Sequence, residues 1–129
     1  MPQATTLKVL VVDDKAAVRE VMRLALEKLG VRVIHEASDG SKAFETALVQ
    51  PIDLIISEYS IPKMDGLELL QAVRKHPALR KLPFILITSR ADRELVITAA
   101  HAGANTYLTK PYTEKSLRQK LEEVMGRLS

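Results

Sequence analysis

The sequence has no cysteine and no tryptophan, and only two phenylalanines and three tyrosines. A chain without cysteine forms neither a disulfide nor a thiolate metal site. Few aromatic residues and no clustered basic stripe argue against direct nucleic-acid binding. No apolar run is long enough to span a bilayer, and no secretory signal is evident. These absences predict a cytoplasmic protein that has neither a membrane nor a nucleic acid as its partner.

Glycine is also scarce, and this excludes a class of phosphate-binding loops. The five glycines form neither G-x-G-x-x-G nor G-x-x-x-x-G-K, the spacings with which backbone amides surround nucleotide phosphates. The histidines, His35, His76 and His101, are far apart and have no metal-ligand spacing.

Length and charge favour one compact domain. The chain has 129 residues, 47% of them apolar, with a formal net charge of +3, which suits a single core. Basic and acidic residues alternate along probable helices, as on solvated faces. We expect a flexible segment at residues 1–6 and a single domain over residues 7–129.

Short apolar runs alternate with longer amphipathic segments, which is typical of repeated βαβ units. Because these runs are apolar enough to be covered on both faces, they predict a doubly wound α/β fold with a five-stranded parallel sheet. The predicted strands are Lys8 to Val12, Arg32 to Ala37, Leu54 to Ser57, Phe84 to Thr88 and Thr106 to Thr109. In the first and last helices, the predicted core stripes are Val18, Val21, Met22, Ala25 and Leu29, and Leu117, Leu121, Val124, Met125 and Leu128. Gly30 and Gly103 are expected to end helices, and Asp39-Gly40 and Asp65-Gly66 to form turns.

Polar residues follow four of these strands. They are Asp13-Asp14, Glu58, Thr88-Ser89 and Thr109-Lys110-Pro111. Since the carboxyl ends of parallel strands share one edge of the sheet, these groups are expected to converge. Three carboxylates, a hydroxyl and an ammonium suit binding of magnesium and a phosphoryl group. Taken alone, the acidic pair could instead cap a helix, and Thr88 could be an ordinary strand residue.

Four motifs carry a family resemblance: Val11-Val12-Asp13-Asp14, Ile61-Pro62-Lys63-Met64-Asp65-Gly66, Ile87-Thr88 and Lys110-Pro111-Tyr112. Together they resemble the two-component response-regulator receiver domain over about residues 7 to 128, closest to the stand-alone chemotaxis (CheY-like) receivers. The resemblance implies a flavodoxin-like fold with strand order 2-1-3-4-5. It also implies a signalling protein rather than an enzyme.

The resemblance also implies roles for individual residues. Magnesium would be bound by Asp13, Asp14, the residue at position 58 and the backbone carbonyl of Ser60. Lys110 would pair with phosphoryl oxygens and precede a cis peptide bond to Pro111. Thr88 would be the switch hydroxyl and Tyr107 the aromatic residue that turns inward behind it.

Glu58 departs from the family pattern, which has an aspartate phosphoryl acceptor at this position. A carboxylate one carbon longer is misplaced for in-line attack, so we expect little or no stable phosphorylation. It could act as a partial phosphomimetic, with one charge against nearly two on a phosphoryl group. Alternatively, it could pair with Lys110 or magnesium and leave the domain inactive. Both a natural phosphorylation-independent receiver and an engineered Asp-to-Glu change would explain it.

The resemblance implies a sensor histidine kinase as the donor and an output protein, such as the flagellar motor switch protein, as the target. Because no segment follows the last helix, output is expected through the strand-five face, at Ala91, Arg93, Val96, Tyr107 and Lys120. An alternative is a cyclic-dinucleotide-binding adaptor that uses Arg90 and Arg93. A third interpretation, a metal-dependent phosphatase, lacks an evident general acid.

Overall fold

The computed structural model describes residues 3–89 and 92–128. Its elements alternate along the chain, so that each parallel strand is joined to the next by a helix. In chain order they are η1 (Ala4–Thr6), β1 (Lys8–Val12), α1 (Ala16–Lys28), β2 (Val33–Ala37), α2 (Gly40–Val49), β3 (Leu54–Glu58), α3 (Gly66–Lys75), β4 (Phe84–Thr88), α4 (Arg93–Ala102), β5 (Thr106–Thr109) and α5 (Glu114–Met125).

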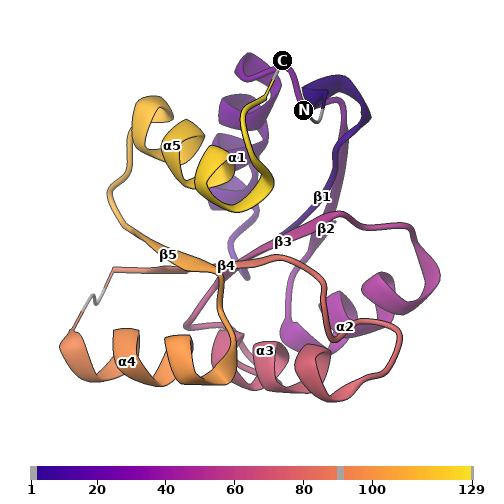
Figure 1. The fold of residues 1–129 in the computed structure, drawn as a ribbon, viewed down its shortest axis with the longest axis vertical. Helices are drawn as coiled ribbons and strands as arrows, with labels where there is room; N and C mark the ends of the chain where they lie inside the picture. Colours follow the sequence, from indigo (N-terminus) through magenta and orange to yellow (C-terminus); the bar gives the residue numbers. More distant parts are fainter. Residues whose placement is uncertain (1–2, 90–91, 129) are drawn as a thin grey trace.

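The five strands form one parallel sheet in the order β2-β1-β3-β4-β5, as predicted. Helices α1 and α5 cover one face, and α2, α3 and α4 cover the other (Figure 1). Alternate side chains of each central strand enter two separate cores. On β1, for example, Val9 and Val11 face α1 and α5, whereas Leu10 and Val12 face the opposite layer. Burial on both faces explains why these strands read as continuous apolar runs.

Strand boundaries agree with the sequence except at two ends. β2 begins at Val33 rather than Arg32, which is exposed. Glu58 is the last residue of β3 rather than the residue after it, and pairs in register with Ile87 of β4. The main chain of Glu58 is therefore fixed by the sheet.

The stripe predicted for α1 was wrong at Val21. The side chain of Val21 is 59% exposed, while Met22 and Leu26 are the buried residues of this helix. Ala25 and Leu29 pack partly against them, and the predicted α5 stripe lies in the same core. At the border of an apolar stripe, the helical period does not distinguish a buried position from an exposed one, which explains the error.

The two Asp-Gly pairs begin helices and do not form free turns. Asp39 caps α2 by accepting from the backbone N–H of Lys42, and Asp65 forms a capping box with Glu68 at the start of α3. Gly30 and Gly103 follow helices with φ of +97° and +101°, as expected for residues without a Cβ.

A short 3-10 helix, Ala4–Thr6, precedes the predicted boundary at residue 7 and places Ala4 in the core at 3% exposure. Its side chain lies against Gly30, where an added Cβ would come within 3.2 Å of the Ala4 Cβ. Contacts with the core therefore include part of the segment expected to be flexible.

Candidate functional site

The predicted site forms at the carboxyl ends of β1, β3, β4 and β5. Asp13 follows β1, Glu58 and Thr88 end β3 and β4, and Lys110 follows β5. Asp13 and Thr88 are buried at 4% and 3% exposure. A buried polar cluster at this edge is consistent with a ligand site in a doubly wound sheet.

Lys110 bridges the two acids, Asp13, which is buried, and Glu58, which is partly buried. Its Nζ lies 2.7 Å from Oε1 of Glu58 and 3.1 Å from Oδ2 of Asp13. The backbone N–H of Lys110 donates to the carbonyl of Thr88, and the Lys110-Pro111 bond is cis, as the resemblance implied. Side-chain exposure is 11% for Glu58 and 25% for Lys110, so this ion pair is largely shielded from water.

The second oxygen of Glu58 is bound by the main chain. Oε2 accepts from the backbone N–H of Tyr59 at 2.7 Å and from that of Ser60 at 3.4 Å. The backbone N–H of Gly66 donates to the carbonyl of Tyr59, which holds the start of α3 against this segment. Both carboxylate oxygens of Glu58 are thus engaged within the domain.

Asp13 is held by contacts on four atoms, and its backbone N–H donates to the carbonyl of Ala37 at 3.2 Å. Its Oδ1 accepts from the backbone N–H of Lys15 at 2.9 Å, and its Oδ2 pairs with Lys110. Its carbonyl accepts from Nη1 of Arg19 at 2.7 Å. The N-cap of α1 is Lys15, with no side-chain cap. The acidic pair therefore does not cap this helix, which removes the simpler interpretation of Asp13 and Asp14.

The electrostatics of the site favour a charged Lys110. Burial lowers the pKa of Lys110, but hydrogen bonds to Glu58 and Asp13 and their negative charges outweigh it, so the pKa lies above the ordinary 10.5. Burial also raises the pKa of Tyr112 above 10.0; the Lys110 charge opposes this rise and the Asp13 charge supports it.

Of the other two predicted metal ligands, Asp14 is exposed, and the backbone N–H of Ser60 donates to Oε2 of Glu58. Within residues 3–89 and 92–128, no group of three or more acidic, histidine or cysteine residues is arranged to hold a metal. The donors suit magnesium in kind, since they are carboxylate and carbonyl oxygens. Of these donors, the carboxylates of Asp13 and Glu58 pair with Lys110.

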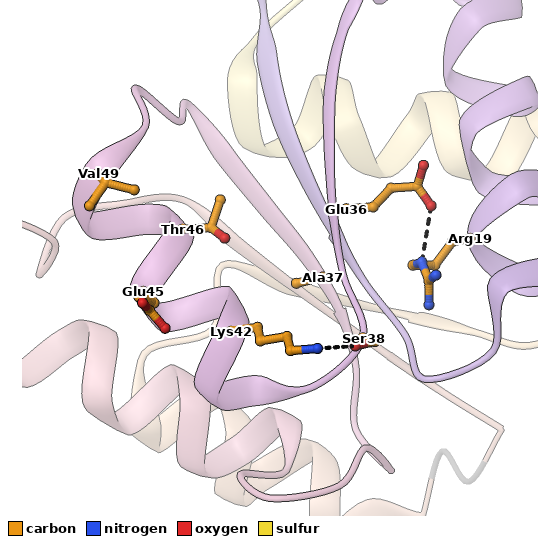
Figure 2. A pocket seen from close by; sticks show the side chains of 8 residues that line it. All are labelled: Arg19, Glu36, Ala37, Ser38, Lys42, Glu45, Thr46 and Val49. Atoms are coloured by element: carbon orange, nitrogen blue, oxygen red, sulfur yellow. Dashed lines mark hydrogen bonds and ion pairs between the residues drawn. The ribbon is translucent and has the colours of Figure 1, made fainter.

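Arg19 was not predicted from the sequence. Its Nε contacts Oε1 of Glu36 at 3.0 Å, and Figure 2 shows this pair between α1 and β2. Arg23 binds the other oxygen of Glu36 at 2.9 Å. Arg19 and Glu36 border a hollow of about 390 Å³ beside α2, in which Lys42 lies 3.5 Å from the hydroxyl of Ser38 (Figure 2). Nothing in the helical period marks Arg19, because its contact with Asp13 depends on how α1 is rotated.

Comparison with known proteins assigns the family. The model of the response regulator receiver domain matches residues 9–122. The chain belongs to the response regulator receiver family. It is 42% identical to a probable chemotaxis protein CheY of Rhizobium etli, over 99% of both chains. It is a CheY-like chemotaxis receiver domain, as the resemblance indicated.

Solved receiver structures agree with this fold. CheY4 of Vibrio cholerae superposes with a TM-score of 0.83 at 30% identity, over 90% of this chain and 96% of that one. The receiver domain of a sensor histidine kinase from Pseudomonas aeruginosa gives 0.84 at 28% identity, over 93% and 98%, and holds magnesium in its active-site cleft. Receiver domains thus include magnesium-binding members and members within kinases.

The residues expected on the receiver's output face lie on three neighbouring elements. Arg93 and Val96 are on α4, Tyr107 is on β5 and Lys120 is on α5; Ala91 lies outside the described residues. The Nζ of Lys120 is 5.3 Å from the centre of the Tyr107 ring and 3.3 Å from Oγ1 of Thr106. Lys120 therefore covers the aromatic residue that was expected to act in switching.

Arginine placement in this receiver gives no support to cyclic-dinucleotide binding. Arg93 is exposed on α4, and Arg90 lies outside the described residues. Arg19 and Arg23 are committed to Glu36, and Arg74 to backbone carbonyls. In the described part of the chain, no helix is long and apolar enough to cross a membrane.

Proposed function

We propose that this receiver works in chemotaxis-like two-component signalling with a fixed carboxylate, Glu58, in place of a phosphoryl acceptor. The observation that carries the proposal is the 2.7 Å contact between Oε1 of Glu58 and Nζ of Lys110. A receiver's lysine at this position would otherwise pair with phosphoryl oxygens. In this chain the carboxylate of Glu58 pairs with Lys110 instead.

The engaged carboxylate accounts for a blocked acceptor. A nucleophile needs a free lone pair aligned with the phosphorus of the donor. Oε1 of Glu58 is bound by Lys110 and Oε2 by the N–H of Tyr59, each at 2.7 Å. Each carboxylate oxygen keeps a lone pair, so the block is proposed to come from orientation: the contacts with Lys110 and Tyr59 hold the longer carboxylate of Glu58 out of line for attack.

The same contact supports partial mimicry of the phosphorylated state. Glu58 supplies one negative charge to Lys110, whereas a phosphoryl group carries nearly two and three strong acceptor oxygens. A group shifts a conformational equilibrium only by its differential interaction with the two states. Glu58 is therefore proposed to bias the Thr88 and Tyr107 switch without saturating it.

Magnesium remains the proposed cofactor of this site. Asp13, Asp14, Glu58 and the carbonyl of Ser60 would hold it, and a bound ion would neutralise acidic charge around an incoming phosphoryl group. The domain itself is proposed to be a cytoplasmic signalling protein rather than an enzyme.

A sensor histidine kinase is the proposed donor, and an output protein such as a flagellar motor switch protein the proposed target. Beside Lys110 lies an apolar groove of about 580 Å³, whose lining includes Val18 and Val21 of α1 and Tyr112. A donor helix entering there would reach the site. Output would use the face formed by Arg93, Val96, Tyr107 and Lys120.

The deciding experiment is phosphorylation by acetyl phosphate with magnesium, measured by intact mass. The unaltered chain should gain no stable phosphoryl group, Glu58→Asp should gain one, and Glu58→Gln serves as the blank. Stable phosphorylation at Glu58 would rule out a blocked acceptor.

Mimicry is tested separately by NMR at Thr88 and Tyr107. The reference for the active state is Glu58→Asp with beryllofluoride, and Glu58→Gln is the reference without the charge. Chemical shifts of the unaltered chain should lie between these two. Shifts equal to those of Glu58→Gln would instead indicate an inactive domain.

A further inference from the structure

The outer edge of β2 is open. In the described part of the chain, β2 pairs with β1 and with no other strand. The carbonyl of Ala37 accepts from the backbone N–H of Asp13, which follows β1, so the backbone groups of Ala37 point inward. Because these groups alternate in direction along a parallel strand, those of Ile34 and Glu36 point outward. Such an edge is a template for pairing with another strand.

Arg23 of α1 covers part of this edge. Its Nη2 donates to the outward carbonyl of Ile34 at 3.1 Å, and its guanidinium also binds Oε2 of Glu36. The side chain of Arg23 is 34% exposed, so its removal would uncover the edge without opening a cavity in the core. Charged side chains placed at a strand edge oppose its pairing with other chains.

The hollow beside this edge has room for part of a further strand. It measures about 390 Å³ and lies between the end of β2 and one side of α2, where Thr46 and Val49 line it (Figure 2). Val49 is 73% exposed. A chain placed along the edge would therefore gain apolar contact as well as backbone hydrogen bonds.

The β2 strand of a second copy fits this edge by two-fold symmetry. When it runs antiparallel with the axis at His35, Ile34 of each copy lies opposite Glu36 of the other. These two pairs use the outward backbone groups of both strands. Val33 of the second copy then lies opposite Ala37, which borders the hollow. His35 lies opposite its own counterpart.

The same symmetry brings the two α2 helices together. Helix α2 contacts both β2 and β1, so it lies over the space between these strands. With neighbouring strands about 4.8 Å apart, the axes of the two α2 helices would be about 10 Å apart. This is within the usual distance of packed helices.

Val49 lies near the proposed axis. Lys42, near the start of α2, contacts Ser38, which follows β2. From Ser38 back to His35 the strand extends ~10 Å, and the antiparallel helix covers the same ~10 Å from Lys42 to Val49. Val49 is therefore level with His35 and would face its counterpart in the second copy.

We propose that the open edge of β2 is a self-association surface, on which a second copy of this chain pairs antiparallel about His35, and that Arg23 holds this surface closed by covering the Ile34 carbonyl. The unaltered chain is then mainly monomeric, and a second copy pairs when Arg23 moves aside. This surface lies apart from the Lys110 site, and the proposal does not depend on the proposed function.

Sedimentation equilibrium of the unaltered chain, Arg23→Met and Arg19→Met tests the role of Arg23. Arg23→Met should dimerise at least about tenfold more tightly than the unaltered chain, a difference of ~1.4 kcal/mol. Arg19→Met is the matched control, because it removes the same charge and the other contact with Glu36 but leaves Ile34 covered. It should not strengthen dimerisation.

The contact between the α2 helices is tested in the Arg23→Met background. Val49→Asp should abolish the gain in dimerisation, since two like charges would then face each other near the axis. Ile97→Asp is the control, because Ile97 is also an exposed apolar residue, at 45%, but lies on α4 near the other end of the sheet. It should keep the gain.

The register is tested by crosslinking, because the chain has no cysteine of its own. At the axis the two Cα atoms of residue 35 would be about 4.5 Å apart, a separation that a disulfide spans. Under oxidation, His35→Cys with Arg23→Met should therefore form a covalent dimer. Val33→Cys with Arg23→Met should not, since its two copies would lie ~13 Å apart along the strands.

A folded Arg23→Met that is still monomeric at about 1 mM, where an association of about 4 kcal/mol would half-populate a dimer, would overturn the proposal. Equal dimerisation of Arg19→Met and Arg23→Met would show that the cover over Ile34 is not what closes the edge. If circular dichroism shows that Arg23→Met does not fold, the two cysteine variants of the otherwise unaltered chain decide: crosslinking at His35→Cys alone supports the edge, and crosslinking at both or neither rejects it.

Discussion

Lys110 Nζ lies closer to Oε1 of Glu58, at 2.7 Å, than to Oδ2 of Asp13, at 3.1 Å. The residue that departs from the family pattern is therefore the main partner of the site's lysine. Because Glu58 is fixed by β3 and by the N–H of Tyr59, this contact couples the strand to the loop after β5. The position of the Lys110 side chain is therefore tied to the end of β3.

The charge on Lys110 predicts how stability changes at alkaline pH. Its pKa is raised in the folded protein above 10.5, so the folded state holds this proton more tightly than the unfolded chain. The stabilisation is complete below the unfolded pKa and is lost as pH rises through the folded pKa. In urea unfolding from pH 8 to 11.5, the free energy of unfolding of the unaltered chain should fall as pH rises. That of Lys110→Met should fall less steeply.

Tyr112 also contributes to this alkaline limb, because its pKa is raised by burial. The comparison is therefore made in a Tyr112→Phe background, where Lys110 is the remaining group at this site with a raised pKa. Identical slopes with and without Lys110 in that background would contradict the assignment.

Much of this arrangement could be predicted from sequence because strand ends determine it. Buried parallel strands are continuous apolar runs, so β1, β4 and β5 were predicted with their observed bounds. The ends of β1, β3 and β5 place Asp13, Glu58 and Lys110 together. Contacts that depend on helix rotation or local main-chain direction were not predictable. These include Arg19 bound to the carbonyl of Asp13, and the Ser60 N–H directed at Glu58.

Gly66 is predicted to be required for the position of Glu58. A Cβ at Gly66 would lie 2.5 Å from the Glu58 carbonyl oxygen and 2.8 Å from the Tyr59 Cα. Alanine in an unstrained helix would gain stability by restricting the unfolded chain, but backbone atoms cannot yield at these distances. Gly66→Ala should lose about 2 kcal/mol in urea unfolding. Gln71→Ala, exposed on the same helix, should be nearly neutral, and a stable Gly66→Ala would refute the close packing.

Arg74 of α3 connects two loops on the side of the sheet opposite α1, the one between α3 and β4 and the one between α4 and β5. Its guanidinium donates to the carbonyls of Gly103, Leu82 and Arg80 and to Oδ1 of Asn105. Burial lowers the pKa of the Arg74 guanidinium. The oxygens to which it donates are all neutral. Lysine has one ammonium and cannot reproduce this planar set of donors.

Arg74→Lys should therefore cost about 2 kcal/mol of unfolding free energy. Arg118→Lys is the control, since Arg118 is 53% exposed and pairs with Glu122 at 3.7 Å on the surface. It should change stability by less than about 0.5 kcal/mol. Equal losses in the two variants would show that Arg74 is not a specific clamp.

A matched pair of substitutions, at Arg19 and Arg23, tests what positions the loop after β1, which contains Asp13, Asp14 and Lys15. Both contact Glu36, but Arg19 also donates to the carbonyl of Asp13 at 2.7 Å, whereas Arg23 donates to that of Ile34. Arg19→Gln should cost about 1–2 kcal/mol and move the amide NMR signals of Asp13, Asp14 and Lys15. Arg23→Gln should leave those signals in place while losing a similar contact with Glu36. If both variants move them equally, the Glu36 pair, rather than the Asp13 carbonyl, positions the loop, because that pair is the interaction that both substitutions remove.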